Sequence, residues 1–488
     1  MSRRKAISIL SRLDIVSLAL NVIIGILLVP YYFTFFTIEI YGFWIATSGL
    51  IVIFDLFDLG ISTIYIQRIG KFFSEGSFQK VVNYLYTGLT LYFFIGVSIL
   101  VSGSIISSYL DVIFDLKENS KVITDCFRIA LFTTFFKIIN TALTNFGNTI
   151  LEPLKYSLVS VFSLFFGIVI IICLLNFGFT IYSLALGYLF QSILALIFSI
   201  GISINKIINL NNGIRGMVKK DIFIDYLSNT KFLFLSRTAE SIVKNIEPAI
   251  IAFILGGQIT SIYVLSKKVA DVIYQLLNIF TGASLYSLVN IQTSKKIKQD
   301  DSRIIYLNQF VFYLTVFSLS LYISGNSDFL TIWVGKEFEV SSYVTFSFAL
   351  SCGMMIWLNF RTIYYFSKDK IQRISFILFF ESILRIFLIY ILIDKFEIIG
   401  GPIAIVISTF IGLLIIDKYK LFYKIQLFPC TLIFLTSFLV SYIDLFNNPI
   451  INLLFKFSFQ LINILVIYTL SGKLKNQVKL VYKYLINA

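Results

Sequence analysis

Charged side chains recur inside stretches of this sequence that are otherwise apolar. In the stretch 231–256, four of them follow one another at spacings of three, four and three residues: Arg237, Glu240, Lys244 and Glu247. On a helix these spacings place all four within roughly 80° of one face. A charge in hydrocarbon costs a few kcal/mol or more, so this face is expected to point to a protein interior or a wet cavity. The bases on this face are suited to bind an anionic group.

Two other apolar stretches carry polar faces of the same kind. In 41–66, Asp55 and Asp58 share a face with two serines. The stretch 122–147 holds Arg128 and Lys137, and Lys137 aligns with polar residues at helical spacing: Asn140, Thr141, Thr144 and Asn148. Together with the stripe in 231–256, these faces predict a hydrated cavity.

The remaining intramembrane charges stand close to charges of opposite sign or near the ends of spans. Lys267 and Lys268 are within helical reach of Asp271, and Glu381 precedes Arg385 by four residues. For Glu381 and Arg385, the spacing is equally compatible with a structural ion pair and with a functional role. Arg361 and Lys456 are expected to extend their side chains towards the lipid headgroups.

Bases outnumber acids inside the apolar stretches. A cavity with a cationic surplus favours a polar cargo that carries an anionic group, such as a pyrophosphate.

The elements that position these residues are transmembrane helices. Hydrophobic residues make up 58% of the 488 and charged residues 14%, and the mean hydropathy is +0.89, far from the composition of soluble domains. Apolar stretches long enough to cross a bilayer recur along the chain: 14–36, 41–66, 82–108, 122–147, 157–177, 180–204, 231–256, 259–288, 305–325, 340–365, 374–393, 399–416, 427–446 and 450–471.

We therefore predict an all-α integral membrane protein with about fourteen transmembrane helices. A basic, Asn-rich stretch interrupts the pattern after the sixth helix. The expected division is an N-terminal lobe of six helices (1–204), a cytoplasmic basic linker (205–230), a second six-helix lobe (231–416) and a C-terminal hairpin with a basic tail (417–488).

Loop charges test this topology independently. Most of the 40 basic residues fall in alternate loops, and the other loops carry acids such as Asp111, Asp115 and Glu337. By the positive-inside rule, both termini are expected to face the cytoplasm.

Several classes of function are disfavoured. The chain has no histidine, which removes His-based catalysis and His-dependent metal sites, and its four cysteines lie in predicted helices without metal-binding spacing. No nucleotide-binding loop GxxxxGK[ST] and no GxSxG motif occur. We expect no enzymatic activity, catalytic residue, metal or cofactor, and no nucleic-acid partner, since no basic stripe or stacking module occurs.

One segment is similar to a known family. FDLFDLGISTIYIQRIGKFFSEGS (Phe54–Ser77), with Asp58-Leu59-Gly60 as its recurrent element, resembles the second helix and following loop of bacterial polysaccharide flippases. ITSIYVLSKKVADVIYQL (Ile259–Leu276) resembles the eighth helix of that family, and FLTIWVGKEF (Phe329–Phe338) its short external loop. These exporters of O-antigen and capsule repeat units belong to the multidrug/oligosaccharidyl-lipid/polysaccharide exporter superfamily.

The resemblance implies a flippase in the bacterial inner membrane that moves undecaprenyl-pyrophosphate-linked oligosaccharide repeat units outward by alternating access. It names the lipid-linked glycan and membrane lipids as partners, with the polysaccharide polymerase and chain-length machinery as further candidates. The expected substrate-binding residues are Arg237, Lys244, Lys137, Lys267, Lys268 and Arg128. Those expected in gating, or in coupling to a proton or sodium gradient, are Asp55, Asp58, Glu240, Glu247, Asp271, Glu381 and Arg385.

Two rival functions stay open. An ion-coupled multidrug exporter of the same superfamily would need a cavity richer in aromatics and carboxylates than in cations. A membrane-embedded polysaccharide polymerase would normally need a sizeable external loop, and the predicted outer loops are short.

Overall fold

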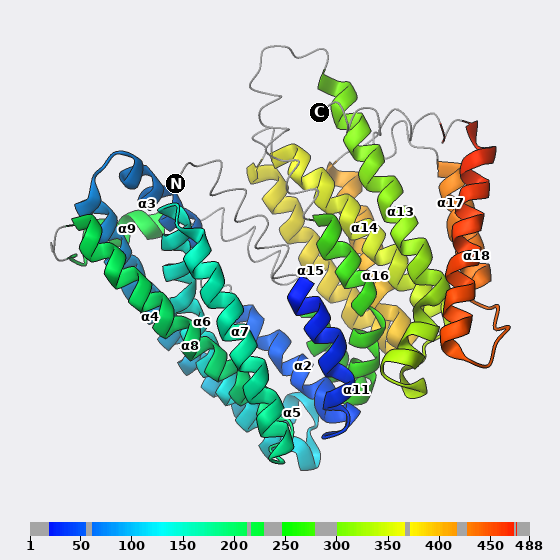
Figure 1. Ribbon diagram of the computed structural model, residues 1–488, viewed down its shortest axis with the longest axis horizontal. Coiled ribbons are helices and arrows are strands. Elements are labelled where there is room, and N and C mark those ends of the chain that lie inside the picture. The colour runs from blue at the N-terminus through cyan, green and yellow to red at the C-terminus, as the bar shows by residue number, and fades with distance from the viewer. Residues whose placement is uncertain are drawn as a thin grey trace. The chain divides into compact units, whose positions relative to one another are not determined.

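The computed structural model describes residues 19–54, 61–211, 216–228, 246–278, 300–366, 371–416, 427–472 and 475. The regular structure in these ranges is helical, with no strand, which confirms the all-α fold class (Figure 1). Eight stretches of helix there are long and apolar enough to cross a bilayer, and three shorter apolar helices accompany them. The chain is a multi-pass membrane protein.

The chain divides into two compact units, Met1–Thr260 and Ser261–Ala488. The first unit begins, in its described part, with a helix over Ala19–Tyr32. Its other elements are α2 (Ile38–Ile53), α3 (Ile61–Ser74), α4 (Phe78–Ser107), α5 (Leu110–Phe114), α6 (Ser120–Thr149), α7 (Pro153–Asn176), α8 (Tyr182–Asn211) and α9 (Lys220–Ser228), with a short 3-10 helix at Lys117–Asn119.

The helix α11 (Glu247–Ser266) contains the division between the units, and helix continues over 268–278. The other elements of the second unit are α13 (Asp300–Trp333), α14 (Ser342–Phe366), α15 (Ile371–Phe396), α16 (Gly400–Ile416), α17 (Leu427–Val440) and α18 (Pro449–Leu470). Short 3-10 helices lie at Lys336–Phe338 and Glu397–Ile399.

In the first unit, α6 is the central element. It packs against α2, α4 and α8, and α8 packs in turn against α7 (Figure 1). The helices α4, α6 and α8 each have 30 residues. At about 1.5 Å per residue they are roughly 45 Å long, so each crosses the hydrocarbon layer and extends into both interfaces.

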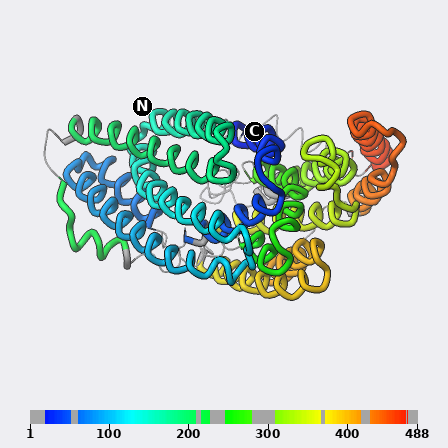
Figure 2. Tube along the Cα trace, turned by 90° about the horizontal axis from the view of Figure 1, so that it is seen from below, coloured from blue at the N-terminus to red at the C-terminus, as the bar shows by residue number. Residues whose placement is uncertain are grey.

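In the second unit, α16 packs against α14 and α15, and α13 packs against α14. The hairpin of α17 and α18 lies against α13, as the orange and red end of the tube in Figure 2 shows. The predicted C-terminal hairpin is therefore present.

Local sequence signals account for several helix ends. Pro153 and Pro449 stand at the first positions of α7 and α18. A backbone N–H at that position has no acceptor within the helix, so proline loses no hydrogen bond there. Asn448 caps α18 because its side chain accepts a hydrogen bond from the N–H of Ile450 at 2.9 Å.

Two glycines set the turn between the predicted seventh and eighth helices. Gly256 has φ 81° and interrupts the helical geometry of α11, a conformation that side chains with a Cβ rarely adopt. At Gly257, a Cβ would lie 2.4 Å from the carbonyl oxygen of Glu39 at the start of α2. The backbones of α2 and α11 thus approach so closely that only glycine fits.

We predict that Gly257→Ala destabilises the protein by about 1–3 kcal/mol, because the backbone atom it meets cannot move aside cheaply. Gly201→Ala in α8 is the control, since a Cβ there meets nothing within 4 Å and alanine favours helix. The measurement is the thermal unfolding midpoint in detergent. An unchanged midpoint for Gly257→Ala would contradict the close approach.

Candidate functional site

The first unit contains an open cavity of about 770 Å³. This volume is in the range of ligand-binding pockets. Its walls come from the helix over Ala19–Tyr32 and from α2, α6, α7 and α8.

The polar face of α6 forms one wall of this cavity. Lys137 lines it together with residues of the same face: Thr133, Thr134, Asn140, Thr141, Thr144 and Asn145. The spacing of three and four residues places these side chains on one side of the helix. The face predicted from the sequence around Lys137 therefore lines a real cavity, although Asn148 is not among the lining residues.

Serine and amide side chains of other helices complete the polar lining: Asn21, Ser48, Ser160, Ser163, Gln191 and Ser192. Lys137 is exposed, and it is the one charged side chain among the described lining residues. The described lining contains no carboxylate. The described lining thus offers one positive charge among neutral hydrogen-bonding groups.

Aromatic side chains line the part of the cavity where α2 and α8 meet the first helix: Tyr32, Tyr41, Trp44 and Tyr188. The rings of Trp44 and Tyr188 are parallel within 3°, with centroids 6.5 Å apart. Trp44 is 8% exposed, whereas Tyr188 is 41% exposed. Sequence reasoning missed these four, because nothing in a chain with 52 Phe and 28 Tyr distinguishes an aromatic residue in a cavity from one in lipid.

Five of the predicted site residues lie outside the described residues: Asp55, Asp58, Arg237, Glu240 and Lys244. Of the seventh-helix stripe, the described member is Glu247. It is 3% exposed and begins α11, where the helix dipole favours a negative charge.

Arg128 does not line the cavity. Its Nε donates to Ser107 Oγ at 3.1 Å, and its Nη1 lies 3.8 Å from Asp125 Oδ1. In the second unit, Lys267, Lys268 and Asp271 are half-buried. The ammonium of Lys267 lies 5.5 Å from the ring centroid of Tyr263, a cation–π distance.

Glu381 and Arg385 form a closed, buried ion pair. Arg385 Nη2 lies 2.5 Å from Glu381 Oε1, and the two side chains are 3% and 1% exposed, respectively. Ser408 on α16 donates to the same carboxylate oxygen at 2.9 Å, and Arg385 donates to Thr409 at 3.0 Å. The pair therefore joins α15 to α16 inside the second unit.

Replacing Arg385 by methionine should cost about 3–5 kcal/mol of stability, because Glu381 is left buried without its partner charge. The double variant Glu381→Gln/Arg385→Met should recover most of this loss, measured as the unfolding midpoint in detergent. Normal transport by the stable double variant is the result expected of a structural pair. Lost transport at normal stability would instead assign Glu381 to ion coupling.

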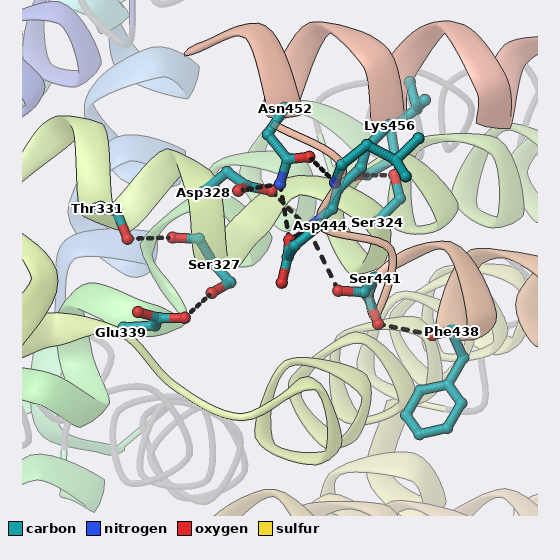
Figure 3. A network of polar contacts seen from close by, with 12 residues as sticks. Ser324, Ser327, Asp328, Thr331, Glu339, Phe438, Ser441, Asp444, Asn452 and Lys456 are labelled. Atoms are coloured by element: carbon teal, nitrogen blue, oxygen red, sulfur yellow. Dashed lines mark hydrogen bonds and ion pairs between the residues drawn. The ribbon is translucent and has the colours of Figure 1, made fainter. Parts of the chain in front are cut away.

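The expectation that Lys456 extends towards the headgroups is wrong. Lys456 is 2% exposed, and its Nζ lies 2.8 Å from Asp328 on α13 and 2.8 Å from Asp444 in the loop before α18 (Figure 3). Asn452 donates to both carboxylates, at 2.8 Å and 2.7 Å. Pairing with two acids outweighs access to water, so the lysine holds the terminal hairpin to α13.

The hydrogen bond from Lys456 holds the pKa of Asp444 below its usual range. The sequence does contain a pattern that indicates the burial of Lys456, although mean hydropathy does not reveal it. Asn452, Lys456 and Gln460 stand four residues apart on α18, and each is at most 2% exposed. Arg361 is likewise buried, at 8%, with its guanidinium 5.3 Å from the ring centroid of Trp357, so its expected extension to the headgroups is also wrong.

A further ion cluster ties the turn between α6 and α7 to α8. Lys206 lies 2.5 Å from Glu152, and Lys155 lies 2.9 Å from it. Burial would raise the pKa of Glu152, but the hydrogen bonds from the two lysines outweigh it and hold the pKa below its usual value. This cluster is structural and does not line the cavity.

Comparison with known proteins shows which solved structures share this fold. No protein-family model and no curated protein sequence matches the chain. Solved structures do match. A lipid II flippase MurJ in an inward-closed conformation has a TM-score of 0.70 and 16% identity, over 94% of this chain and 98% of that one.

Multidrug resistance transporters of the MATE family, in the MOP superfamily, match as well. An inward-facing structure has a TM-score of 0.61 and 13% identity, over 81% of this chain and 97% of that one. An outward-facing structure has a TM-score of 0.58 and 12% identity, over 85% and 94% of the two chains. The chain has the fold of MOP-superfamily transporters. At these identities the likeness is one of fold, which serves both a lipid flippase and drug exporters.

Proposed function

We propose that this chain flips undecaprenyl-pyrophosphate-linked oligosaccharide repeat units from the cytoplasmic to the outer face of the bacterial inner membrane. The observation that carries the proposal is the charge of the cavity in the first unit. Lys137 is the one charged side chain among its described lining residues, and the rest of the polar lining is hydroxyl and amide.

This lining suits a sugar phosphate. An ammonium forms charge-assisted hydrogen bonds to a diphosphate, and these are stronger where surrounding protein replaces water. Hydroxyl and amide groups such as those of Asn140, Asn145 and Gln191 both donate and accept, as sugar hydroxyls do. The polyprenyl chain stays in the lipid while the head group moves through the protein, and alternating access between two states carries it across.

The basic residues expected on the seventh helix, Arg237 and Lys244, extend this proposal, since they would add to the positive charge that the head group meets. Glu240 and Glu247, with Asp55 and Asp58, are the proposed sites for a coupling proton or sodium ion. The resemblance of Phe54–Ser77 to polysaccharide flippases supports the same cargo.

A multidrug exporter is the second candidate, and the four aromatic residues of the cavity favour it. Rings such as those of Tyr188 and Tyr41 attract organic cations by cation–π contacts. Lys137 would repel the same cations, and the described lining offers no carboxylate to offset it. The charge therefore supports the flippase over the exporter.

Lys137→Gln tests the proposal. Loss of a charge-assisted hydrogen bond worth about 1.5–3 kcal/mol predicts roughly 10- to 150-fold slower translocation. The assay follows a radiolabelled lipid-linked oligosaccharide in inverted membrane vesicles as it becomes inaccessible to an added glycosidase. Lys137→Arg, which keeps the charge, should retain most of the rate.

The matched control is Lys121→Gln, which removes the same charge from an exposed position near the start of α6. It should leave the rate unchanged. If Lys137→Gln flips the glycan normally, or if it gains export of a cationic dye such as ethidium while the wild type shows no glycan transport, the cavity serves another cargo.

A further inference from the structure

Residues 216–226, which include most of α9, are held to α3 and α4 of the first unit by hydrogen bonds. Asp225 on α9 accepts two hydrogen bonds from the guanidinium of Arg68, at 2.6 Å and 2.7 Å, and a third from the hydroxyl of Tyr84 at 3.0 Å. Tyr226 is fully buried, and its hydroxyl donates to the carbonyl of Tyr84 at 2.9 Å. One side of α9 is thus fixed to α3 and α4.

The chain just before α9 runs along α4. The N–H of Met217 donates to the side chain of Asn83 at 2.9 Å, and the N–H of Lys219 donates to Thr87 at 3.2 Å. At Gly216, a Cβ would lie 2.5 Å from the ring of Tyr86, so the backbone of the segment lies close against α4. Side chains of α4 therefore satisfy backbone groups of this segment.

These contacts give the depth of the segment in the membrane. Asn83 and Thr87 are the sixth and tenth residues of α4, which begins at Phe78. At about 1.5 Å per residue they lie roughly 8 and 14 Å from the end of a helix of about 45 Å. A hydrocarbon layer of about 30 Å centred on this helix begins roughly 7 Å from its end. The segment beside Asn83 and Thr87 therefore extends from the boundary between headgroups and acyl chains to roughly 6 Å inside it, a depth at which interfacial helices lie.

The outward side of the same segment is apolar and basic. Met217, Val218 and Ile224 are 65%, 56% and 53% exposed. Lys219 and Lys220 are exposed beside them. In water such a surface would be unfavourable, but at a membrane boundary its apolar side chains enter the acyl region and its lysines reach the phosphates.

Acidic residues do not cancel this charge. Asp225 is engaged by Arg68, and Asp221 stands in the first turn of α9, where the helix dipole favours a carboxylate. The exposed surface of this segment therefore carries two lysines, Lys219 and Lys220, and one acid, Asp221, so its net charge is positive.

We propose that residues 216–226 form an interfacial anchor whose apolar side chains insert at the acyl boundary and whose Lys219 and Lys220 bind the phosphates of anionic phospholipids. The anchor is a lipid-binding surface distinct from the cavity, and it is independent of which cargo the cavity carries. Because Arg68 and Asp225 fix it to α3, it holds the chain that leaves α8 at a constant depth.

A depth measurement tests the anchor. A fluorescent label is attached at Ile224→Cys in a Cys173→Ala background, where the remaining native cysteines, Cys126, Cys352 and Cys430, are buried. The protein is reconstituted in phosphatidylcholine vesicles that contain phosphatidylglycerol. Nitroxides near the lipid headgroup should quench the label strongly, and nitroxides near the acyl terminus or iodide in water only weakly.

Two positions calibrate the measurement. Glu75→Cys, exposed in the turn between α3 and α4, should respond to iodide, and Phe94→Cys, 60% exposed near the middle of α4, should respond to the deep nitroxide. A label at Ile224 that responds as at Glu75 means that the segment faces water or a soluble partner. A response as at Phe94 means that it is immersed in the hydrocarbon. Either result overturns the proposal.

The lysines are tested separately. Phosphatidylglycerol should raise the thermal midpoint of the wild-type protein in mixed micelles, and Lys219→Gln/Lys220→Gln should lose most of this shift. Lys117→Gln/Lys121→Gln removes two exposed charges at the opposite end of the first unit and should keep it. Equal shifts in both double variants would show that the lysines bind no anionic lipid.

Discussion

The cost of a charge in hydrocarbon is the constraint on which this structure depends. A membrane interior cannot solvate an ion, so each charged side chain at that depth needs a partner, a wet cavity or a route to the headgroups. The chain uses all three solutions. Glu381 and Arg385 neutralise one another, Lys137 faces a cavity, and the lysines before and within α9 lie at the membrane boundary.

Two kinds of polar group occur among the described residues: those paired with other groups of the protein, and those that line the cavity. The clusters around Lys456 and Arg385 pair their charges within the protein and bring helices together. The polar face of α6 lines a space of about 770 Å³. A polar lining of this kind is costly to leave without water or a ligand. The one charge among its described residues, on Lys137, favours an anionic cargo.

Periodicity was sufficient to predict what depends on one helix alone. The face around Lys137 follows from residue spacing, and the turn near residue 256 follows from the length of the apolar stretches. Sequence could not predict what depends on a second helix. One partner of Lys456 is Asp328, 128 residues away, and the residues around each of the two give no sign of the other. Tyr188 lines the cavity beside Trp44 of α2, and spacing along α8 cannot reveal a contact with another helix.

The most direct test of the account is to delete the gene in its native host and to measure lipid-linked oligosaccharide and surface glycan together with drug sensitivity. The account predicts that the lipid-linked repeat accumulates on the cytoplasmic face while surface polymer is lost, and that the gene restores both but its Lys137→Gln form does not. Normal glycan with new sensitivity to cationic drugs would contradict the account and would assign the cavity to a multidrug exporter.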